Sequence, residues 1–280
     1  MALAHRAGGV DRDAMTKRVD LFDSTYKNFQ DRVHDAVRKE TYGIDIGQNS
    51  WLTVDEYERM LPWLELKADE HVLEVASGSG GPALYMARTT GCCVTGIDVN
   101  PSGVATASEL AAKAGQADRV CFTVANATAA LPFDDHTFHG LVCIDSMNHF
   151  PDRRAVLREW RRVLRPGRRA LFTDPVVITG PITNDELALR SSIGLFLFVP
   201  PGINEHLIEE AGFRLIRKDD VSGNAAAIAG RWHEARRTHE AELRRIEGDE
   251  RFEGLQRFFK AVHNLTSRKQ LSRIVYLVEA

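Results

Sequence analysis

Residues 71–82 join an apolar run of strand length to a glycine-rich turn, with the sequence HVLEVASGSGGP. Glycines let backbone N–H groups approach a ligand where a Cβ would intrude, and a sharp strand-to-helix turn points a helix N-terminus at that ligand. Asp98 ends the next apolar run, where a carboxylate can accept both hydroxyls of a ribose. The loop and this carboxylate together predict a site for a nucleoside-containing cofactor.

Two cofactor classes fit this loop. Residues 78–83, GSGGPA, match the G-x-G-x-x-G/A pattern of dinucleotide binding, which would make the protein an NAD-dependent oxidoreductase. Glu74 at the end of the strand and Pro82, which lacks an N–H for a pyrophosphate, favour S-adenosylmethionine. The spacing within the loop is compatible with both classes.

The loop needs a rigid sheet behind it, and the chain supplies alternating strand-like and helix-like segments. Apolar runs that predict strands lie at 71–75, 92–97, 120–124, 141–144 and 170–173, with helix-compatible segments at 82–89, 102–114 and 152–164. Gly91 stands where a helix end is expected, and Pro166 and Gly167 predict a turn into the fifth strand. Runs that are apolar at every position and alternate with helices indicate buried parallel strands of a doubly wound α/β sheet.

The last third of the chain changes character. A helix over 204–211 and a strand over 213–221 precede two helical stripes over 224–247 and 252–265, and a final strand follows over 271–278. We therefore predict a Rossmann-like, seven-stranded, mostly parallel sheet with a helical cap inserted before the last strand and an N-terminal helical lid. By residue range, the lid covers 1–65, the cofactor-binding core covers 66–222 and 271–280, and the cap covers 223–270.

Composition restricts the partners. The chain has 36 Lys and Arg against 39 Asp and Glu, a formal net charge of -3, whereas a general nucleic-acid binder would be basic. The arginine-rich stretch 153–169 is interpreted as a solvated helix face. The longest apolar stretch, 193–203, is too short to span a bilayer, and the first twenty residues lack the apolar run of a signal peptide.

Cysteine usage indicates the compartment. Cys92, Cys93, Cys121 and Cys143 show no metal-ligand spacing. We therefore expect no metal site, and we expect buried free thiols in a cytoplasmic protein.

The glycine loop resembles that of the class I S-adenosylmethionine-dependent methyltransferases. Their acid-x-Gly-x-Gly-x-Gly pattern aligns with Glu74 to Gly80, with Ala76 in place of the first glycine. Further family landmarks follow in order at 125–127 (ANA), 131–138 (LPFDDHTF) and 163–167 (VLRPG). The resemblance implies an enzyme whose cofactor is S-adenosylmethionine. It assigns cofactor contacts to Glu74, Ala76, Ser77, Gly78 and Gly80, ribose binding to Asp98, and adenine contacts to Val99, Asn126 and Ala127.

Within this fold, the sequence is most similar to small-molecule methyltransferases of the sarcosine, phosphoethanolamine, tocopherol and sterol type. Their fourth strand ends in an acidic residue followed four positions later by His, which matches Asp145 and His149. The resemblance implies that both line the methyl-transfer centre, with Asp145 also touching the cofactor. His149 is then a general base for a hydroxyl acceptor or a structural residue, and Asp145 binds an acceptor cation or stiffens its loop.

Other site residues come from outside the core. Residues 47–51, GQNSW, resemble the segment that covers the cofactor in this branch, which assigns Gln48 and Trp51 to the cofactor. An N-cap at Thr53 explains the same stretch equally well. Aromatic side chains that can shape an acceptor pocket, or stabilise a cationic amine, are Tyr26, Phe196, Phe198 and Trp232.

The predicted function is methyl transfer from S-adenosylmethionine to an oxygen or nitrogen atom of a small-molecule acceptor, without membrane insertion and with acceptor and oligomeric state left open. The alternatives are C-methylation of a small molecule, an NAD-dependent oxidoreductase, and a cofactor-binding regulator without catalysis. A nucleic-acid methyltransferase is disfavoured, because DSMN at 145–148 lacks the two prolines typical of enzymes that methylate base amino groups.

Overall fold

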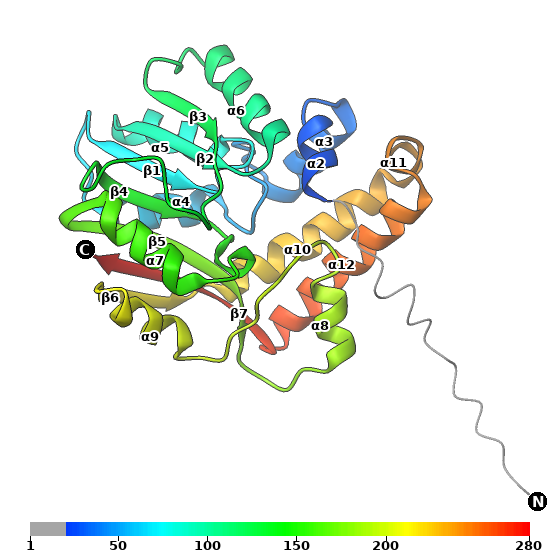
Figure 1. Cartoon of the computed structure of the whole chain (residues 1–280). Helices are drawn as coiled ribbons and strands as arrows, with labels where there is room; N and C mark the ends of the chain where they lie inside the picture. Colours follow the sequence, from blue (N-terminus) through cyan, green and yellow to red (C-terminus); the bar gives the residue numbers. More distant parts are fainter. Residues whose placement is uncertain (1–20) are drawn as a thin grey trace, which may run out of the picture.

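The computed structural model describes residues 21–280, which contain one seven-stranded sheet. The strands are β1 (His71–Val75), β2 (Cys93–Asp98), β3 (Val120–Val124), β4 (Phe138–Cys143), β5 (Leu164–Ile178), β6 (Arg214–Asp220) and β7 (Leu271–Glu279). Their order across the sheet is β3-β2-β1-β4-β5-β7-β6 (Figure 1). Strands β1 to β5 pair in parallel, and β7 runs antiparallel to β5 and β6. The predicted doubly wound, mostly parallel sheet is thus confirmed.

The strand order creates one place for a ligand. The chain first builds outward from β1 through β2 to β3, then returns to the other side of β1 with β4 and β5. The loops after β1 and β4 therefore leave the sheet in opposite directions and open a crevice at the carboxyl ends of these strands. In open α/β sheets, ligands bind in such a crevice.

Helices cover both faces of the sheet. The helices of the alternating part are α5 (Gly81–Thr90), α6 (Pro101–Lys113), α7 (Arg153–Val163) and α9 (Ile203–Glu210). One core forms between α7, α9 and one face, and a second forms between α4 (Val54–Met60), the 3₁₀ helix η1 (Leu61–Leu64), α5 and the other face. Neighbouring strand residues supply opposite cores, as Val72 and Leu73 do, because side chains alternate across a strand.

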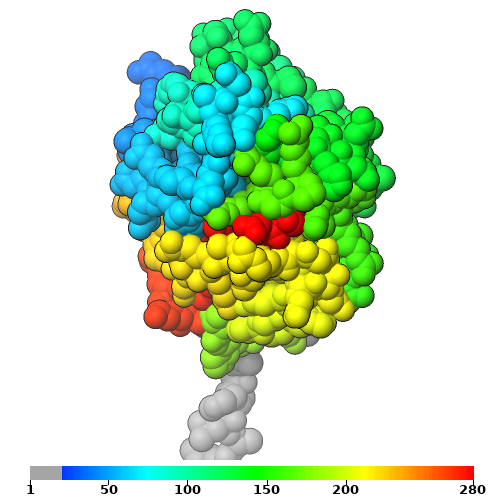
Figure 2. Space-filling view, turned by 90° about the vertical axis from the view of Figure 1, so that its left-hand side faces the viewer, coloured from blue at the N-terminus to red at the C-terminus, as the bar shows by residue number. Residues whose placement is uncertain are grey.

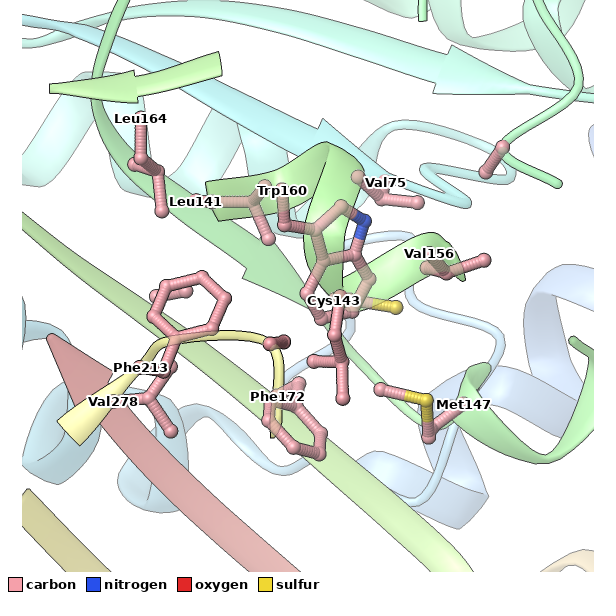
Figure 3. Close-up of a cluster of buried hydrophobic side chains, with 14 of the residues drawn as sticks. Val75, Leu141, Cys143, Met147, Val156, Trp160, Leu164, Phe172, Phe213 and Val278 are labelled. Atoms are coloured by element: carbon pink, nitrogen blue, oxygen red, sulfur yellow. The ribbon is translucent and has the colours of Figure 1, made fainter. Parts of the chain in front are cut away.

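Trp160 is at the centre of the core beneath α7 (Figure 3). Its indole is fully buried and meets Phe150 and Phe172 edge to face, with ring centroids 6.3 and 5.7 Å apart. Phe172 in turn stacks on Tyr276 of β7 at 4.9 Å. These rings join α7 to the neighbouring strands β5 and β7.

A separate helical layer stands beside the sheet. It is built from α2 (Phe22–Lys27), α3 (Arg32–Tyr42), α8 (Asn184–Arg190), α10 (Ser222–Thr238), α11 (Glu240–Glu247) and α12 (Asp249–Ser267), which Figure 1 shows together. Val33 and Val37 of α3 share an apolar cluster with Ile228 of α10 and Phe252 and Leu255 of α12. Segments from both ends of the sequence thus bury each other's apolar faces.

The two ends of the α10–α12 segment lie side by side. The N–H of Val221 donates to the carbonyl of Arg273, and the N–H of Arg273 donates to Oγ of Ser222, both at 2.9 Å. The chain therefore leaves the sheet after β6 and returns to it in β7 at nearly the same point. Figure 2 shows the end of β7 as a red strip between green and yellow segments, as expected for a strand paired on both sides.

Several local predictions need correction. The two stripes over 224–247 and 252–265 form three helices, because the backbone leaves the helical conformation at His239 and at Gly248, whose φ is 81°. Gly91 ends α5 as predicted, but Pro166 and Gly167 are not a turn before β5. They form a bulge within the strand, where the pairing with β4 shifts.

Three further predictions concern the burial of the cysteines, the N-terminal lid and membrane-spanning helices. Cys92 and Cys143 are buried as predicted, but Cys121 is exposed because β3 is an edge strand with one open face. Residues 1–20 of the predicted lid lie outside the described residues. Between residues 21 and 280, no helix has the length and apolar character needed to cross a bilayer.

Replacement of Trp160 by alanine tests the central core. We expect the free energy of unfolding to fall by about 3–5 kcal/mol, because a fully buried indole leaves a cavity. Urea denaturation followed by circular dichroism measures the loss. The matched control is Trp63→Ala, since Trp63 is only partly buried on η1; equal losses in the two variants would contradict the assigned core.

Candidate cofactor and acceptor site

A cavity of about 490 Å³ occupies the crevice at the carboxyl ends of β1, β2 and β4. Each of the loops that follow β1 to β4 contributes to its wall. Its lining includes Glu74, Ala76, Ser77, Gly78, Ser79, Pro82, Asp98, Val99, Asn100, Asn126, Ala127, Asp145 and His149. The N-terminal part of the chain closes it with Phe22, Tyr26, Asn49 and Ser50.

The glycine loop reaches the cavity through a left-handed backbone. Ala76 has φ 58° and Gly78 has φ 53°, so the alanine takes the conformation of the glycine it replaces. A Cβ on Gly78 would lie 2.6 Å from Oη of Tyr26, which excludes any side chain there. Gly80 does not line the cavity; a Cβ there would meet Phe122 at 2.5 Å. Its predicted cofactor contact is therefore replaced by a packing role beneath the loop.

Asp98 is held rigidly at the end of β2. Its Oδ2 accepts the N–H of Gly78 and its Oδ1 accepts the N–H of Asn100, both at 2.8 Å. Burial raises the pKa of Asp98, while these two N–H groups work against the rise by stabilising the carboxylate. Each carboxylate oxygen keeps further acceptor capacity toward the cavity, which suits two adjacent hydroxyls.

Glu74 is a buried carboxyl group in the cavity wall. Its side chain is 2% exposed, and Oε2 has no hydrogen-bond partner among the described residues. Burial, with a smaller contribution from the charge of Asp98, raises the pKa of Glu74 to about 8. An orphaned carboxyl oxygen in a cavity needs a donor from a ligand, and a cationic group would restore its ionised form.

Val99 and Asn126, for which adenine contacts are predicted, are exposed residues of the cavity lining. Oδ1 of Asn126 accepts the N–H and the hydroxyl of Thr128 at 3.0 and 2.8 Å, so its Nδ2 is left to meet a ligand. Val99 exposes 67% of its surface. An apolar side chain beside an amide donor suits a flat heteroaromatic base.

Asp145 follows β4 and accepts three hydrogen bonds from other parts of the protein. Oδ1 accepts Oγ1–H of Thr173 at 2.7 Å and Nε–H of Arg273 at 2.6 Å, and Oδ2 accepts the N–H of Trp51 at 2.8 Å. Arg273 also donates Nη1–H to Oε1 of Glu56 at 2.6 Å. Of the two roles open from the sequence, this geometry supports stiffening of the loop.

His149 lies four residues further on, in the wall of both this cavity and a smaller one. Its Nδ1 is 2.9 Å from the carbonyl oxygen of Leu195, and it meets Phe196 and Phe22 edge to face at 4.7 and 5.6 Å. A carbonyl only accepts, so Nδ1 carries the hydrogen and the neutral imidazole has its lone pair on Nε2. In this tautomer, Nε2 is the ring nitrogen that can accept a proton.

The smaller cavity has a volume of about 50 Å³ and adjoins the first. Six residues line both cavities: Phe22, Asn49, Ser50, Asp145, His149 and Ile193. The rest of its wall is largely aromatic, with Tyr42, Trp51, Phe196, Trp232, Phe258 and Phe259, together with Pro175 and Arg190. The aromatic wall suits an apolar acceptor frame next to His149.

The other predicted site residues fall into two groups: some line a cavity and others do not. Tyr26 lines the larger cavity, and Trp51, Phe196 and Trp232 line the smaller one. Gln48 lines neither, and is instead fully buried where its Oε1 accepts the N–H of Ile46 at 2.9 Å. The cofactor contact predicted for Gln48 is therefore replaced by a role in shaping its loop.

Phe198 also lines neither cavity. It stacks on Phe196, with ring centroids 6.3 Å apart. Sequence reasoning missed Phe22, Asn49 and Arg190, which all line the cavities. Phe22 and Arg190 come from segments with no resemblance to a binding motif, whereas Asn49 stands in the segment 47–51 that also holds the predicted residues Gln48 and Trp51. For Arg190 a local signal exists, since Thr183 and Glu186 form a capping box at the start of its helix.

Known proteins resemble this chain in sequence and in fold. A family described as a methyltransferase domain matches residues 72–167. Methyltransferase GfsG of Streptomyces halstedii is 34% identical over 75% of this chain and 77% of its own length. O-methyltransferase resE of Aspergillus sclerotiorum is 37% identical over 59% of this chain and 62% of its own length. Phosphoethanolamine N-methyltransferase 2 of Haemonchus contortus, solved with S-adenosylhomocysteine, gives a TM-score of 0.77 at 18% identity, covering 92% of this chain and 59% of that one.

The strand order, the glycine loop and Asp98 at the end of β2 together define an enzyme class: proteins with the class I methyltransferase fold, which bind a nucleoside-containing cofactor. The chain belongs to the class I S-adenosylmethionine-dependent methyltransferases. Its cofactor is S-adenosylmethionine and its reaction is methyl transfer. The oxidoreductase and the non-catalytic regulator that the loop left open are thereby set aside.

Replacement of Asp98 by alanine tests the ribose contact. We expect S-adenosylhomocysteine to bind about 2 kcal/mol more weakly, because two charge-assisted hydrogen bonds are lost. Isothermal titration calorimetry measures the dissociation constant. Asp134→Ala, an exposed carboxylate elsewhere, is the control. An unchanged dissociation constant in Asp98→Ala would remove this residue from the cofactor site.

Glu74 predicts a specific pH dependence of stability. Its pKa is raised in the folded state, so the folded protein holds a proton that the unfolded chain loses above pH ~4.5. The wild type should therefore lose stability relative to Glu74→Gln as the pH rises from 5 to 9, by more than about 1 kcal/mol. Melting temperatures across this range test the difference, with exposed Glu109→Gln as control. A constant difference between wild type and Glu74→Gln would contradict the raised pKa.

Proposed function

We propose that the acceptor is a small molecule methylated at oxygen or nitrogen, with a hydroxyl oxygen favoured. The observation that carries this proposal is the imidazole of His149 at the junction of the two cavities, with Nδ1 bound to Leu195 and the lone pair on Nε2. A hydroxyl gains from such a base, whereas an amine needs only to arrive neutral. The relative resE is named an O-methyltransferase, which agrees.

The larger cavity suits S-adenosylmethionine along its length. Asp98 would hold the ribose hydroxyls, and Val99 and Asn126 would contact the adenine. The unpaired oxygen of Glu74 would meet the cationic amino group at the methionine end. The bound cofactor supplies an activated methyl group, so the enzyme has to position the acceptor and exclude water.

The chain's own residues then carry out the remaining tasks. The aromatic wall of the smaller cavity holds the acceptor frame, while Asp145 holds the loop that carries His149. His149 would take the acceptor's proton at Nε2 as the bond between the acceptor oxygen and the methyl carbon forms; the sulfur–methyl bond of the cofactor would break in the same step, and S-adenosylhomocysteine would be the leaving group. Tyr26, whose hydroxyl lies over Gly78, covers the glycine loop and keeps water out. In this proposal α2 and α3 act as the lid and α10 to α12 as the cap.

Charge pairing supports a small acceptor over a nucleic acid. Five of the eight arginines in the stretch 153–169 pair with nearby carboxylates: Arg153 with Asp174, Arg154 with Glu210, Arg162 with Glu159 and Asp135, Arg168 with Glu70, and Arg169 with Glu65. Arg153 is moreover buried, which corrects the interpretation of this stretch as a uniformly solvated face. These arginines do not present a continuous basic surface for phosphates.

Replacement of His149 by glutamine tests the base. An acceptor is first found by screening phenols, alcohols and amines with radiolabelled cofactor. For a hydroxyl acceptor, we expect the single-turnover rate to fall about 10²–10⁴-fold, because proton removal accompanies methyl transfer. Affinity for S-adenosylhomocysteine should stay unchanged.

The matched control is His206→Gln, an exposed histidine far from the cavities, which should keep the full rate. A small loss of rate in His149→Gln with a hydroxyl acceptor would contradict the base. A loss of cofactor affinity and of melting temperature together would assign His149 a structural role in the loop.

A further inference from the structure

Arg190, at the end of α8, is a buried cation without a polar partner. Its side chain is 2% exposed, and its Nη1 has no hydrogen-bond partner. Among residues 21–280, its guanidinium forms no ion pair with a carboxylate. Arg190 lines the smaller cavity, beside the wall that carries His149.

The surroundings of this guanidinium are aromatic. Its central carbon lies 4.6 Å from the ring centroid of Phe196, 5.3 Å from that of Phe258 and 6.0 Å from that of Trp51. Ring faces stabilise a cation, but they do not accept the five N–H donors that arginine offers. The donor capacity of Arg190 is therefore left for something else.

The nearest carboxylates are bonded to other arginines. Asp145 is bonded to Arg273 at 2.6 Å, and Asp174 is bonded to Arg153 at 2.5 Å. Burial lowers the pKa of Arg190 to about 9, while Asp145 and Asp174 act in the opposite direction, so the guanidinium stays charged at neutral pH.

Comparison within the chain shows how unusual this is. The other buried arginines among the described residues all pair with a carboxylate: Arg38 at 3.0 Å, Arg153 at 2.5 Å, and Arg236 and Arg273 at 2.6 Å. A buried charge without a partner destabilises a fold, so it persists where it has a function. The partner of Arg190 is thus expected to come from a ligand in the cavity that it lines.

We propose that Arg190 binds a carboxylate of the acceptor in the smaller cavity, while the atom to be methylated faces His149. This inference rests on the proposed small-molecule function and narrows its substrate class to organic acids with an apolar, aromatic-compatible frame. The planar guanidinium matches a carboxylate with two parallel hydrogen bonds. The cavity, about 50 Å³, has room for a group of that size.

Matched pairs of acids and amides test the proposal. Benzoate and phenylacetate, and their uncharged carboxamides, are titrated into wild-type protein saturated with S-adenosylhomocysteine. Trp51 and Trp232 line the same cavity, so tryptophan fluorescence reports on its occupation. We expect each acid to bind at least about 30-fold more tightly than its amide, because only the acid pairs with the buried charge.

Variants assign this preference to one side chain. Arg190→Met should abolish it, Arg190→Lys should retain it at about tenfold weaker affinity, and the control Arg257→Met, exposed on α12, should leave it unchanged. Removal of an unpartnered buried charge should also leave the melting temperature of Arg190→Met unchanged or higher. Arg236→Met, which removes two hydrogen bonds from the buried carboxylate of Glu247, should lower it.

Two results would overturn the proposal: equal binding of acids and amides by wild-type protein, or a preference that survives in Arg190→Met. If Arg190→Met does not fold, Arg190→Lys decides, since acid binding equal to that of the wild type would likewise refute a bidentate contact. Titration with S-adenosylhomocysteine alone distinguishes a failure of this inference from a failure of the proposed function. Normal affinity for it with no acid preference refutes only this inference, whereas no affinity for it refutes the proposed function as well.

Discussion

The buried ion pairs among Glu56, Asp145 and Arg273 are the constraint on which the site depends. One guanidinium bonds two carboxylates, each at 2.6 Å, and all three side chains are at most 5% exposed. Such groups are costly to desolvate, so the arrangement is stable only while every partner is present. It ties α4, the loop after β4 and the start of β7 to one point in space.

That point determines where the chemistry can take place. Asp145 adopts a left-handed backbone, φ 54°, and its second oxygen holds the N–H of Trp51. The loop that carries His149 and the segment that carries Trp51 therefore meet in a set geometry. The family resemblance places Asp145 at the reaction centre. In this structure its carboxylate holds Trp51, Thr173 and Arg273 by hydrogen bonds, which is a positioning role.

Local patterns predicted many of the residues that line the larger cavity, because its floor is built from contiguous sequence. Apolar runs and glycines specify β1, its loop and α5, and Asp98 follows from the next strand without any long-range information. The acceptor half is different, since Phe22, Asn49, Arg190 and Trp232 come from four distant segments. Their meeting depends on how α3 packs on α10 and α8 on α12, which no local pattern encodes.

The errors have the same origin. Gln48 and Trp51 belong to one short segment, yet only Trp51 reaches a cavity, because the backbone turn made by Gln48 itself decides which side chains face inward. Phe196 likewise lines the smaller cavity, whereas Phe198 lines neither. The family resemblance identified Gln48 and Trp51 as candidates, and the aromatic residue type identified Phe196 and Phe198, but the direction of each side chain is a tertiary property.

The adjoining ends of the α10–α12 segment suggest how this enzyme type diversifies. Since Val221, Ser222 and Arg273 hold the exit and the return of the chain together, the intervening helices close a loop whose entropic cost changes slowly with length. Insertions or exchanges there would leave the register of β6 and β7 untouched. Natural selection can thus replace the α10–α12 segment, and with it Trp232, Phe258 and Phe259 of the smaller cavity, while the sheet and the glycine loop are inherited unchanged.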